Sequence, residues 1–347
     1  MMEVSRLTPL KDEVGIAGGR LTLDEHRERL AYAQRYPLPS MALIAHKWAG
    51  ERVIVCGGGA SLQKTLPAIR ARCKLSKRTK IMACNKTHDF LLDKGIVPDF
   101  GIMLDPKEWV KDYMTPHRDV IYLLGSTLHP DVLDKFREAK AKAYIYHPIG
   151  DGDAEYLLDL FPPNQNTMAM IAGYSTVGLR SVYASEVLGF DEIHLHGFDS
   201  CYDPNAQDLY AYAKPNTVHD PMGICVKASD GTELKAVSNR MMARQVTEFQ
   251  DMVYALHSAI QEQHMRPIEL KVAGDGAIPW LAWKLGIHTN PDLMEAKYGK
   301  KQVFNYTTNE PEEARVWIDM PKTVTLSDLP NTIGGSYAQP FAEDLRQ

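Results

Sequence analysis

The chain has 347 residues, of which 44% are hydrophobic and 24% are charged, with a net charge of −5 and a pI near 6.2. These values are normal for a soluble globular protein, and the length allows one large domain or two modest ones. The acidic balance argues against a protein that binds nucleic acid mainly through phosphate contacts, because such proteins carry an excess of basic residues.

The cysteine pattern and the hydropathy point to a reducing, aqueous compartment. The five cysteines are scattered and form no CxxC pair, namely Cys56, Cys73, Cys84, Cys201 and Cys225. Their spacing does not match a zinc site, and reduced, buried thiols are the simplest account. No apolar run approaches the roughly 20 residues needed to cross a bilayer, and residues 1–10 do not resemble a signal sequence. We therefore expect a soluble, cytoplasmic protein.

Residues 1–50 are expected to form a helical N-terminal extension. Thr22 and Glu25 fit a capping box, which predicts a helix over residues 23–35. A second short helix is expected over residues 40–48.

From residue 51 onward, short apolar runs alternate with amphipathic stretches. The apolar runs predict strands over residues 52–56, 80–84, 100–104, 120–124, 143–146, 192–196 and 268–272. The stretches between them predict helices over residues 61–74, 87–94, 130–139, 153–160, 175–188 and 239–263. This alternation predicts an α/β domain over residues 51–287 with a doubly wound, mostly parallel sheet. Such sheets bind ligands beyond the carboxyl ends of their strands, so functional residues are expected there.

Two segments break this alternation. Residues 200–238 are long and irregular, which is typical of a functional lid inserted into the domain. Residues 288–347 contain few long apolar runs and many Asn, Pro, Thr and Gly residues. We expect an extended C-terminal tail there, either packed on a neighbouring subunit of a homo-oligomer or disordered.

A glycine-rich loop, Gly57-Gly58-Gly59, follows the first strand of the domain, and Ser61 opens the next helix. Glycines let backbone amides approach a phosphate or a base closely, and Ser61 can cap a helix whose N-terminus favours an anion. The loop is neither a Walker loop nor a GxGxxG motif. A turn without a ligand is the alternative, but its position after the first strand favours nucleotide binding.

Polar residues also follow the next strands. Asn85 can donate to and accept from a ribose or phosphate, or simply cap a helix. Asp105 can hold a hydroxyl or a divalent metal, or serve as a cap. Ser175 and Thr176 enter a helix, where they form either a second anion or base site or an ordinary helix cap.

The last group of candidates begins with Asp199, which lies just past a predicted strand. Tyr202, Tyr210 and His219 lie in the irregular segment. A loop histidine near tyrosines can act as a general base or stabilise a departing phosphate, although many loop histidines have no chemical role. The sequence Gly274-Asp275-Gly276 predicts a tight turn at the same edge of the sheet, facing a ligand or not.

Taken in order, these motifs resemble the family that includes motility accessory factors and archaeal 6-hydroxymethyl-dihydropterin pyrophosphokinases. The matching segments are residues 57–62, 84–85, 94–99, 104–106, 173–178, 196–199, 219 and 274–279. The resemblance covers roughly residues 51–287, and the same skeleton is similar to bacterial CMP-sialic-acid-dependent sialyltransferases. It implies a Rossmann-like fold and a nucleotide or nucleotide-sugar ligand.

The resemblance also implies roles for individual residues. In the sialyltransferases, the positions that match the glycine loop with Ser61, and the position that matches Asn85, hold the nucleotide. The nearest matches to the residues that assist departure of the phosphate are Tyr202, Tyr210 or Tyr212, and His219.

The leading hypothesis is a glycosyltransferase that uses a nucleotide-activated sugar, such as a CMP-activated nonulosonic acid, and a small-molecule or glycan acceptor. His219 would be the base or phosphate stabiliser, with Tyr202 and Tyr210 as phosphate ligands, and no cofactor would be required. One alternative is a Mg²⁺-dependent pyrophosphokinase that transfers diphosphate from ATP to a pterin-like alcohol, with Asp105 and Asp199 as metal ligands. Another is a non-catalytic nucleotide-binding protein.

Overall fold

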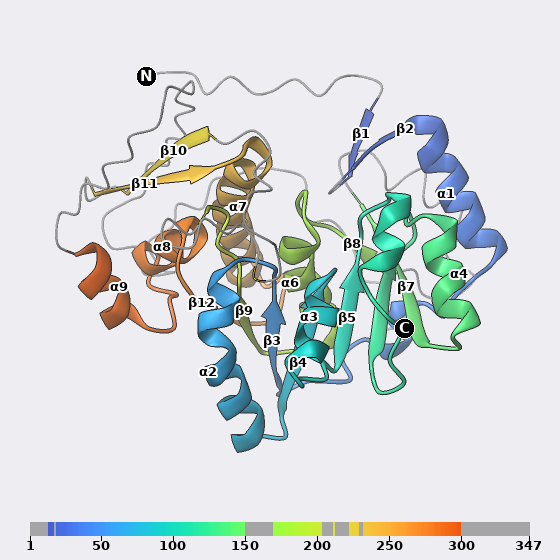
Figure 1. Ribbon diagram of the computed structural model, residues 1–347, viewed down its shortest axis with the longest axis horizontal. Helices are drawn as coiled ribbons and strands as arrows, with labels where there is room; N and C mark the ends of the chain where they lie inside the picture. The colour runs from blue at the N-terminus through green and yellow to red at the C-terminus, as the bar shows by residue number, and fades with distance from the viewer. Residues whose placement is uncertain are drawn as a thin grey trace. The chain divides into compact units, whose positions relative to one another are not determined.

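The computed structural model describes residues 13–16, 19–149, 169–202, 211, 222–228 and 232–299. Helices flank an eight-stranded parallel sheet with the strand order β12-β9-β3-β4-β5-β6-β7-β8 (Figure 1). This is the α/β, Rossmann-like class that the sequence predicted. The chain divides into two compact units. Unit 1 comprises Met1–Lys47 and Ile81–Leu188, and unit 2 comprises Trp48–Lys80 and Gly189–Gln347.

Unit 1 contains a run of parallel strands that pair in chain order. They are most of β4 (Thr79–Cys84), then β5 (Phe100–Met103), β6 (Ile121–Gly125), β7 (Lys142–Pro148) and β8 (Met170–Ile171). Its helices are α1 (Leu23–Arg35), α3 (Thr87–Asp93), α4 (Pro130–Glu138) and α6 (Val177–Leu188), with 3₁₀ turns η1 (Met41–Ile44) and η2 (Glu108–Asp112). An antiparallel hairpin of β1 (Glu13–Ile16) and β2 (Gly19–Thr22) precedes α1.

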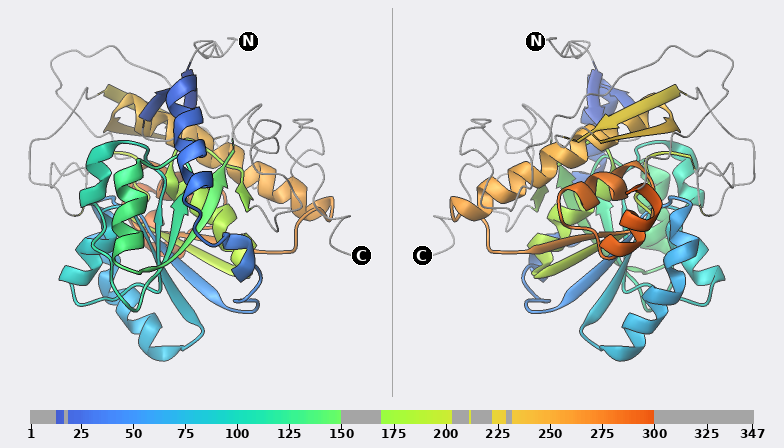
Figure 2. Two further views of the ribbon diagram at one scale, coloured as in Figure 1. Left: turned by 90° about the vertical axis from the view of Figure 1, so that its right-hand side faces the viewer. Right: turned by 90° about the vertical axis from the view of Figure 1, so that its left-hand side faces the viewer.

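The core of unit 1 shows why its strands are apolar throughout. Helices α1 and α4 lie side by side (Figure 2), and residues such as Ala33 and Phe136 join Tyr122 of β6 in one buried cluster. On α6, Ser185 reaches Met82 of β4, with 4.0 Å between Oγ and Sδ. Helices therefore cover both faces of these strands, as their continuous apolar sequence predicted.

Unit 2 contains three parallel strands in the order β12 (Glu269–Ala273), β9 (Glu192–His196) and β3 (Arg52–Cys56). Its helices are α2 (Ser61–Leu75), α7 (Arg240–Gln261), α8 (Ala277–Lys284) and α9 (Pro291–Tyr298). An antiparallel hairpin pairs β10 (Met222–Lys227) with β11 (Glu233–Ser238). No helix in the described part of the chain combines the length and apolar character needed to cross a bilayer.

Several sequence expectations need correction. The expected irregular segment 200–238 contains the β10–β11 hairpin, and burial alternates along β11 between buried Leu234 and exposed Lys235. This two-residue period is the signal that the sequence interpretation overlooked. The expected helix over residues 40–48 is only the 3₁₀ turn η1. The helix expected over residues 153–160 lies outside the described residues.

The expected extended tail also begins with ordered structure. Helix α9 is capped by Asn290, whose side chain accepts from the Leu293 N–H at 3.1 Å, and it buries Met294. Lys297 and Tyr298 at its end both bind the carboxylate of Asp275. One apolar contact and this pair of polar contacts hold a helix whose sequence carries few apolar residues.

The capping box at the start of α1 is present as predicted. The Thr22 hydroxyl accepts from the Glu25 N–H at 3.2 Å, and the Glu25 carboxylate accepts from the Thr22 N–H at 2.8 Å. Both partners are local in sequence, which is why the motif could be found without the fold.

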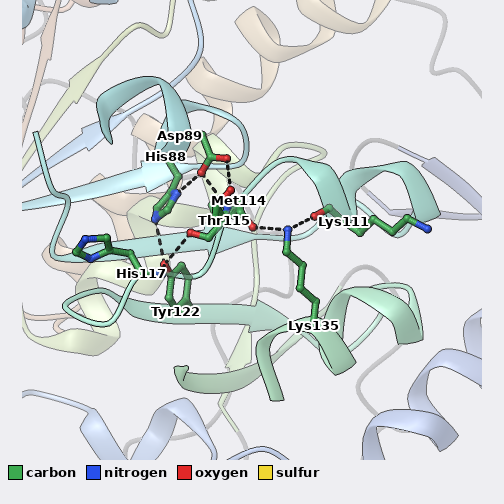
Figure 3. Close-up of polar contacts among 8 residues, drawn as sticks. All are labelled: His88, Asp89, Lys111, Met114, Thr115, His117, Tyr122 and Lys135. Atoms are coloured by element: carbon green, nitrogen blue, oxygen red, sulfur yellow. Dashed lines mark hydrogen bonds and ion pairs between the residues drawn. The ribbon is translucent and has the colours of Figure 1, made fainter. Parts of the chain in front are cut away.

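The loop between β5 and β6 is held by side chains of α3 and β6 (Figure 3). The Asp89 carboxylate accepts from both the N–H and the hydroxyl of Thr115, each at 2.9 Å. The buried His88 ring lies between Asp89, at 2.6 Å, and the Tyr122 hydroxyl, at 3.1 Å. That hydroxyl accepts from the His117 N–H at 2.6 Å. A helix residue and a strand residue therefore fix the same loop from two sides.

Helix α4 holds the loop from a third side. The Lys135 ammonium donates to the carbonyls of Lys111 and Met114, at 2.8 Å to Met114 (Figure 3). Carbonyls in a loop have no regular backbone partner, so a half-buried cation that binds two of them is a substantial restraint.

We predict that Lys135→Met lowers the free energy of unfolding by about 2 kcal/mol, because two loop carbonyls lose a charged donor. Denaturant titration of the full chain measures this. Lys111→Met is the matched control: its ammonium makes only surface ion pairs with Glu108 and Asp131 in the described structure, and its loss should change stability by less than about 1 kcal/mol. Equal effects of the two substitutions would contradict the prediction.

Candidate functional site

The sequence-predicted site residues fall into two groups, one in each unit. Unit 2 holds the glycine loop 57–59 with Ser61 and Asp199, and unit 1 holds Asn85, Asp105, Ser175 and Thr176. Tyr210, Tyr212 and His219 lie outside the described residues. Each group is described within its own unit.

In unit 2, Asp199 is the residue around which the glycine loop folds. The Ser61 N–H donates to Asp199 Oδ2 at 2.6 Å, and the Ser61 hydroxyl donates to Oδ1. The Asp199 carbonyl accepts from the N–H of Ala277, the first residue of α8, at 2.8 Å. One residue thus caps the N-termini of two helices, where a negative charge is favourable.

This arrangement corrects the expected role of Ser61 as a helix cap. The N-cap residue of α2 is Ala60, which has no side-chain cap, and the acceptor comes instead from Asp199, far away in sequence. Sequence reasoning could not pair the two residues, because a cap supplied by another strand leaves no local motif.

Close packing explains two of the glycines. A Cβ on Gly57 would lie 2.6 Å from the Gly197 carbonyl oxygen, and a Cβ on Gly59 would lie 2.6 Å from the Asp199 carboxyl carbon. No side chain fits at such distances, so the loops after β3 and β9 can approach only as glycine. The Gly58 carbonyl accepts from the Ala211 N–H at 2.9 Å.

Burial dominates the electrostatics of Asp199. It raises the pKa of the carboxyl from 3.8 to about 7, while the two hydrogen bonds from Ser61 oppose this shift. Because Ser61 occupies both carboxylate oxygens, Asp199 has a structural role that the sequence did not reveal.

We predict that Gly59→Ala lowers the free energy of unfolding by about 3 kcal/mol, since a methyl group would overlap the Asp199 carboxylate. Gly223→Ala is the control, because a Cβ there meets no heavy atom within 4 Å. We expect it to change stability by less than about 1 kcal/mol. Thermal or denaturant unfolding of both variants tests this, and a tolerated Gly59→Ala would rule out the packing role.

In unit 1, polar residues gather where β4, β5 and β6 end. The register pairs Met103 with Leu124, which places Asp105 level with Ser126 two residues beyond the paired positions. Asn85 follows β4 directly with a φ of +47°, and its N–H donates to the Ile102 carbonyl at 3.0 Å. The carboxyl ends of three neighbouring strands therefore present polar side chains at one edge.

Several of these side chains are buried without hydrogen bonds. Within the described part of the chain, no partner is found for Asn85 Oδ1 or for the hydroxyls of Thr87, Ser126 and Thr127. Thr87, Ser126 and Thr127 are completely buried. Each buried polar group without a partner costs about 1–3 kcal/mol, so this edge retains unused capacity to bind a polar ligand.

Asp105 lies at the same edge and is half-buried. Its Oδ1 accepts from the Lys107 N–H at 3.1 Å. Burial raises the pKa of its carboxyl to about 6, and the interactions with Lys107 only partly oppose this. A carboxylate held at some electrostatic cost is a common property of functional sites.

Ser175 and Thr176 lie at the start of α6. The Thr176 hydroxyl accepts from the Leu179 N–H at 3.2 Å, so Thr176 acts as a helix cap, which was the alternative reading of this motif. The sequence reasoning missed Arg180, which is buried and donates to the carbonyls of Ile149 and Ile171 at 2.9 and 2.6 Å. The signal available in the sequence was a single arginine within an otherwise mostly apolar helix, which indicates that the guanidinium has polar partners in the interior.

Tyr202, a predicted phosphate ligand, is buried in unit 2. It packs against Met242 and Val237, and its N–H donates to the Val237 carbonyl at 2.8 Å. Burial raises the pKa of its hydroxyl, and Asn239 opposes this. The described residues contain no group of three or more His, Cys, Asp or Glu side chains placed to hold a metal ion.

The raised pKa of Asp105 generates a pH prediction. Between its ordinary value of 3.8 and about 6, the folded chain holds a proton that the unfolded chain has released, so the stability contributed by this group falls as the pH rises through that window. Asp105→Asn removes this dependence. We expect the free energy of unfolding of the variant minus that of wild type to be about 1 kcal/mol larger at pH 7 than at pH 4. This value is reduced because the Asp105 side chain is partly exposed to solvent. Parallel stability profiles between pH 4 and 7 would contradict this.

The chain belongs to the MptE-like family, because the model of the 6-hydroxymethylpterin diphosphokinase MptE-like proteins matches residues 28–205. This confirms the resemblance drawn from the sequence motifs. Among solved structures, the MAf glycosyltransferase from Magnetospirillum magneticum AMB-1 is similar with 19% identity and a TM-score of 0.48. The similarity covers 74% of this chain and 39% of that one, so this chain spans well under half of its length. No curated protein sequence matches the chain.

Proposed function

We propose that this member of the MptE-like family is a transferase that takes a group from a nucleotide donor held at the carboxyl ends of β4, β5 and β6. The observation that carries this proposal is the set of buried, unbonded oxygens on Asn85, Ser126 and Thr127. They lie at the sheet edge where parallel α/β proteins bind ligands. Hydroxyl and amide groups both donate and accept, which suits the oxygens of a ribose or a phosphate.

We place glycosyl transfer from a nucleotide-activated sugar first, with a CMP-activated nonulosonic acid as the donor. The metal-dependent alternative was predicted to use both Asp105 and Asp199, and the contacts of Asp199 with Ser61 give that carboxylate a structural role in unit 2. Tyr210, Tyr212 and His219, which the resemblance matches to residues that assist departure of the phosphate, lie outside the described residues. His219 would then serve as the base or stabilise the leaving phosphate, as the sialyltransferase resemblance implies.

Diphosphoryl transfer from ATP to a pterin-like alcohol is the second candidate, and the family description favours it. Mg²⁺ is often bound by one or two carboxylates together with the phosphates of the substrate, and Asp105 fits that requirement whereas Asp199 does not. When bound, the ion would neutralise charge on the transferred phosphates.

A thermal-shift screen of the full chain with CMP, CDP, UDP, GDP, ADP and ATP, each with and without Mg²⁺, tests the proposal. We expect a cytidine nucleotide to stabilise the protein without Mg²⁺, by roughly 2.7 kcal/mol at 100 times its dissociation constant. Ser126→Ala should weaken that binding, because Ser126 lies at the binding edge. Ser76→Ala is the control and should leave nucleotide binding unchanged. In the described structure the Ser76 hydroxyl only accepts from the exposed Arg78 N–H.

Product analysis separates the two candidate reactions. Glycosyl transfer from a CMP-sugar releases CMP, whereas diphosphoryl transfer from ATP releases AMP. Stabilisation by ATP only in the presence of Mg²⁺, lost in Asp105→Asn, would favour diphosphoryl transfer. If no nucleotide stabilises the chain, the proposed function is wrong.

A further inference from the structure

The 3₁₀ turn η2, directly after Asp105, leaves one large aromatic side chain exposed. Glu108 and Lys111 bind each other at 2.9 Å on one side of the turn, and Val110 is buried in the core of unit 1 on another. The Trp109 side chain remains 58% exposed. An exposed tryptophan next to a buried anchor residue is a candidate for ligand contact, because its ring offers a large apolar face.

Trp109 is connected to Asp105 through Tyr113. The Trp109 side chain lies within hydrogen-bonding reach of the Tyr113 hydroxyl, and the charge of Asp105 acts on the same hydroxyl. The indole N–H is only a donor, so the edge of the ring is the part that can meet the Tyr113 hydroxyl. Asp105 and Trp109 therefore lie in the same loop, four residues apart in the chain, beyond the carboxyl end of β5.

The backbone that carries Trp109 is fixed in place. Figure 3 shows Lys135 binding the carbonyls of Lys111 and Met114, and Asp89 binding Thr115. A preorganised ring loses less entropy when it binds a ligand than one on a loop that must first become ordered. The anchoring of this loop thus favours Trp109 as a rigid binding surface.

Resting on the proposed function, we propose that the base of the donor nucleotide stacks on Trp109 and that Asp105 accepts a hydrogen bond from an exocyclic amino group of that base. Stacking of a base on an aromatic side chain is favourable for every base, whereas an ionised carboxylate can only accept hydrogen bonds. Cytosine offers an amino group. Uracil carries a carbonyl oxygen at that position, which the carboxylate repels.

A protein partner is the other possible occupant of an exposed tryptophan. The adjacent half-buried Asp105 favours the nucleotide, because its position at the carboxyl end of the parallel strands is where such sheets bind small ligands. The experiment treats the protein partner as one of its outcomes.

Calorimetric titration of the full chain with CMP and UMP tests the assignment. Wild type should bind CMP about tenfold more tightly than UMP, as expected for one hydrogen bond to a charged group. Trp109→Ala should weaken both by about tenfold, and Trp109→Phe should restore most of the loss. Asp105→Asn should bring the CMP and UMP affinities close together. Glu108→Gln, on the same turn but paired with Lys111, is the matched control and should bind as wild type does.

Fluorescence provides a second measurement that does not depend on an alanine variant. The chain has five tryptophans, so Trp109→Phe removes one of five emitters. CMP should quench the emission of wild type and should quench the variant less. Should the screen find only adenine nucleotides, AMP and IMP replace CMP and UMP, because IMP carries an oxygen where AMP carries the amino group.

The outcomes separate this inference from the proposed function. Nucleotide binding that is equal in wild type and Trp109→Ala overturns the stacking role and leaves the function intact, and it would direct attention to a protein partner for Trp109. A CMP preference that persists in Asp105→Asn, or an Asp105 effect seen only with Mg²⁺, overturns the amino-group contact. If wild type binds no nucleotide at all, the proposed function and this inference both fail.

Discussion

Every polar group buried at the carboxyl end of a parallel strand needs a partner, and in both units of this chain some of these groups have one in the described structure and others do not. In unit 2, Asp199 binds Ser61 at the start of α2 through its carboxylate and Ala277 at the start of α8 through its carbonyl. In unit 1, the side-chain oxygens of Asn85 and Ser126 are buried with no hydrogen bond in the described part of the chain, and in unit 2 the same holds for both ring nitrogens of His196, the last residue of β9. Satisfied groups hold a fold together, whereas unsatisfied ones favour a bound ligand.

The contacts of Asp199 change the meaning of the glycine loop. A loop of three glycines after the first strand of an α/β domain suggests a phosphate site, but Gly57 and Gly59 are required where the chain passes Gly197 and Asp199. Because Gly57 and Gly59 have no side chain, the loop after β3 can pack closely against the loop after β9. A glycine motif therefore indicates that a ligand or another loop approaches the backbone closely, but it does not distinguish between the two.

The loop between β5 and β6 joins structure to the candidate site. Its polar anchors, His88-Asp89, Tyr122 and Lys135, come from three different elements and bind backbone and side chains of the loop (Figure 3). Asp105 and Trp109 both lie within this loop. Anchors of this kind contact no ligand, yet they determine where the functional side chains of the loop lie. The anchoring residues are also distant in sequence from the side chains that they position.

The sequence alone determined the local structure of this protein. Strands β3 and β9 and helix α1 begin and end where apolar runs and the Thr22–Glu25 capping box predicted, since those signals depend only on neighbouring residues. The sequence also showed that Asn85 and Asp105 follow predicted strands. Because the carboxyl ends of parallel strands lie at one edge of a sheet, both residues were expected at that edge. Only the tertiary structure decided that Ser61 pairs with Asp199 and that Asp275 holds α9. Those contacts join residues distant along the chain, and their energies depend on burial and geometry that no local pattern records.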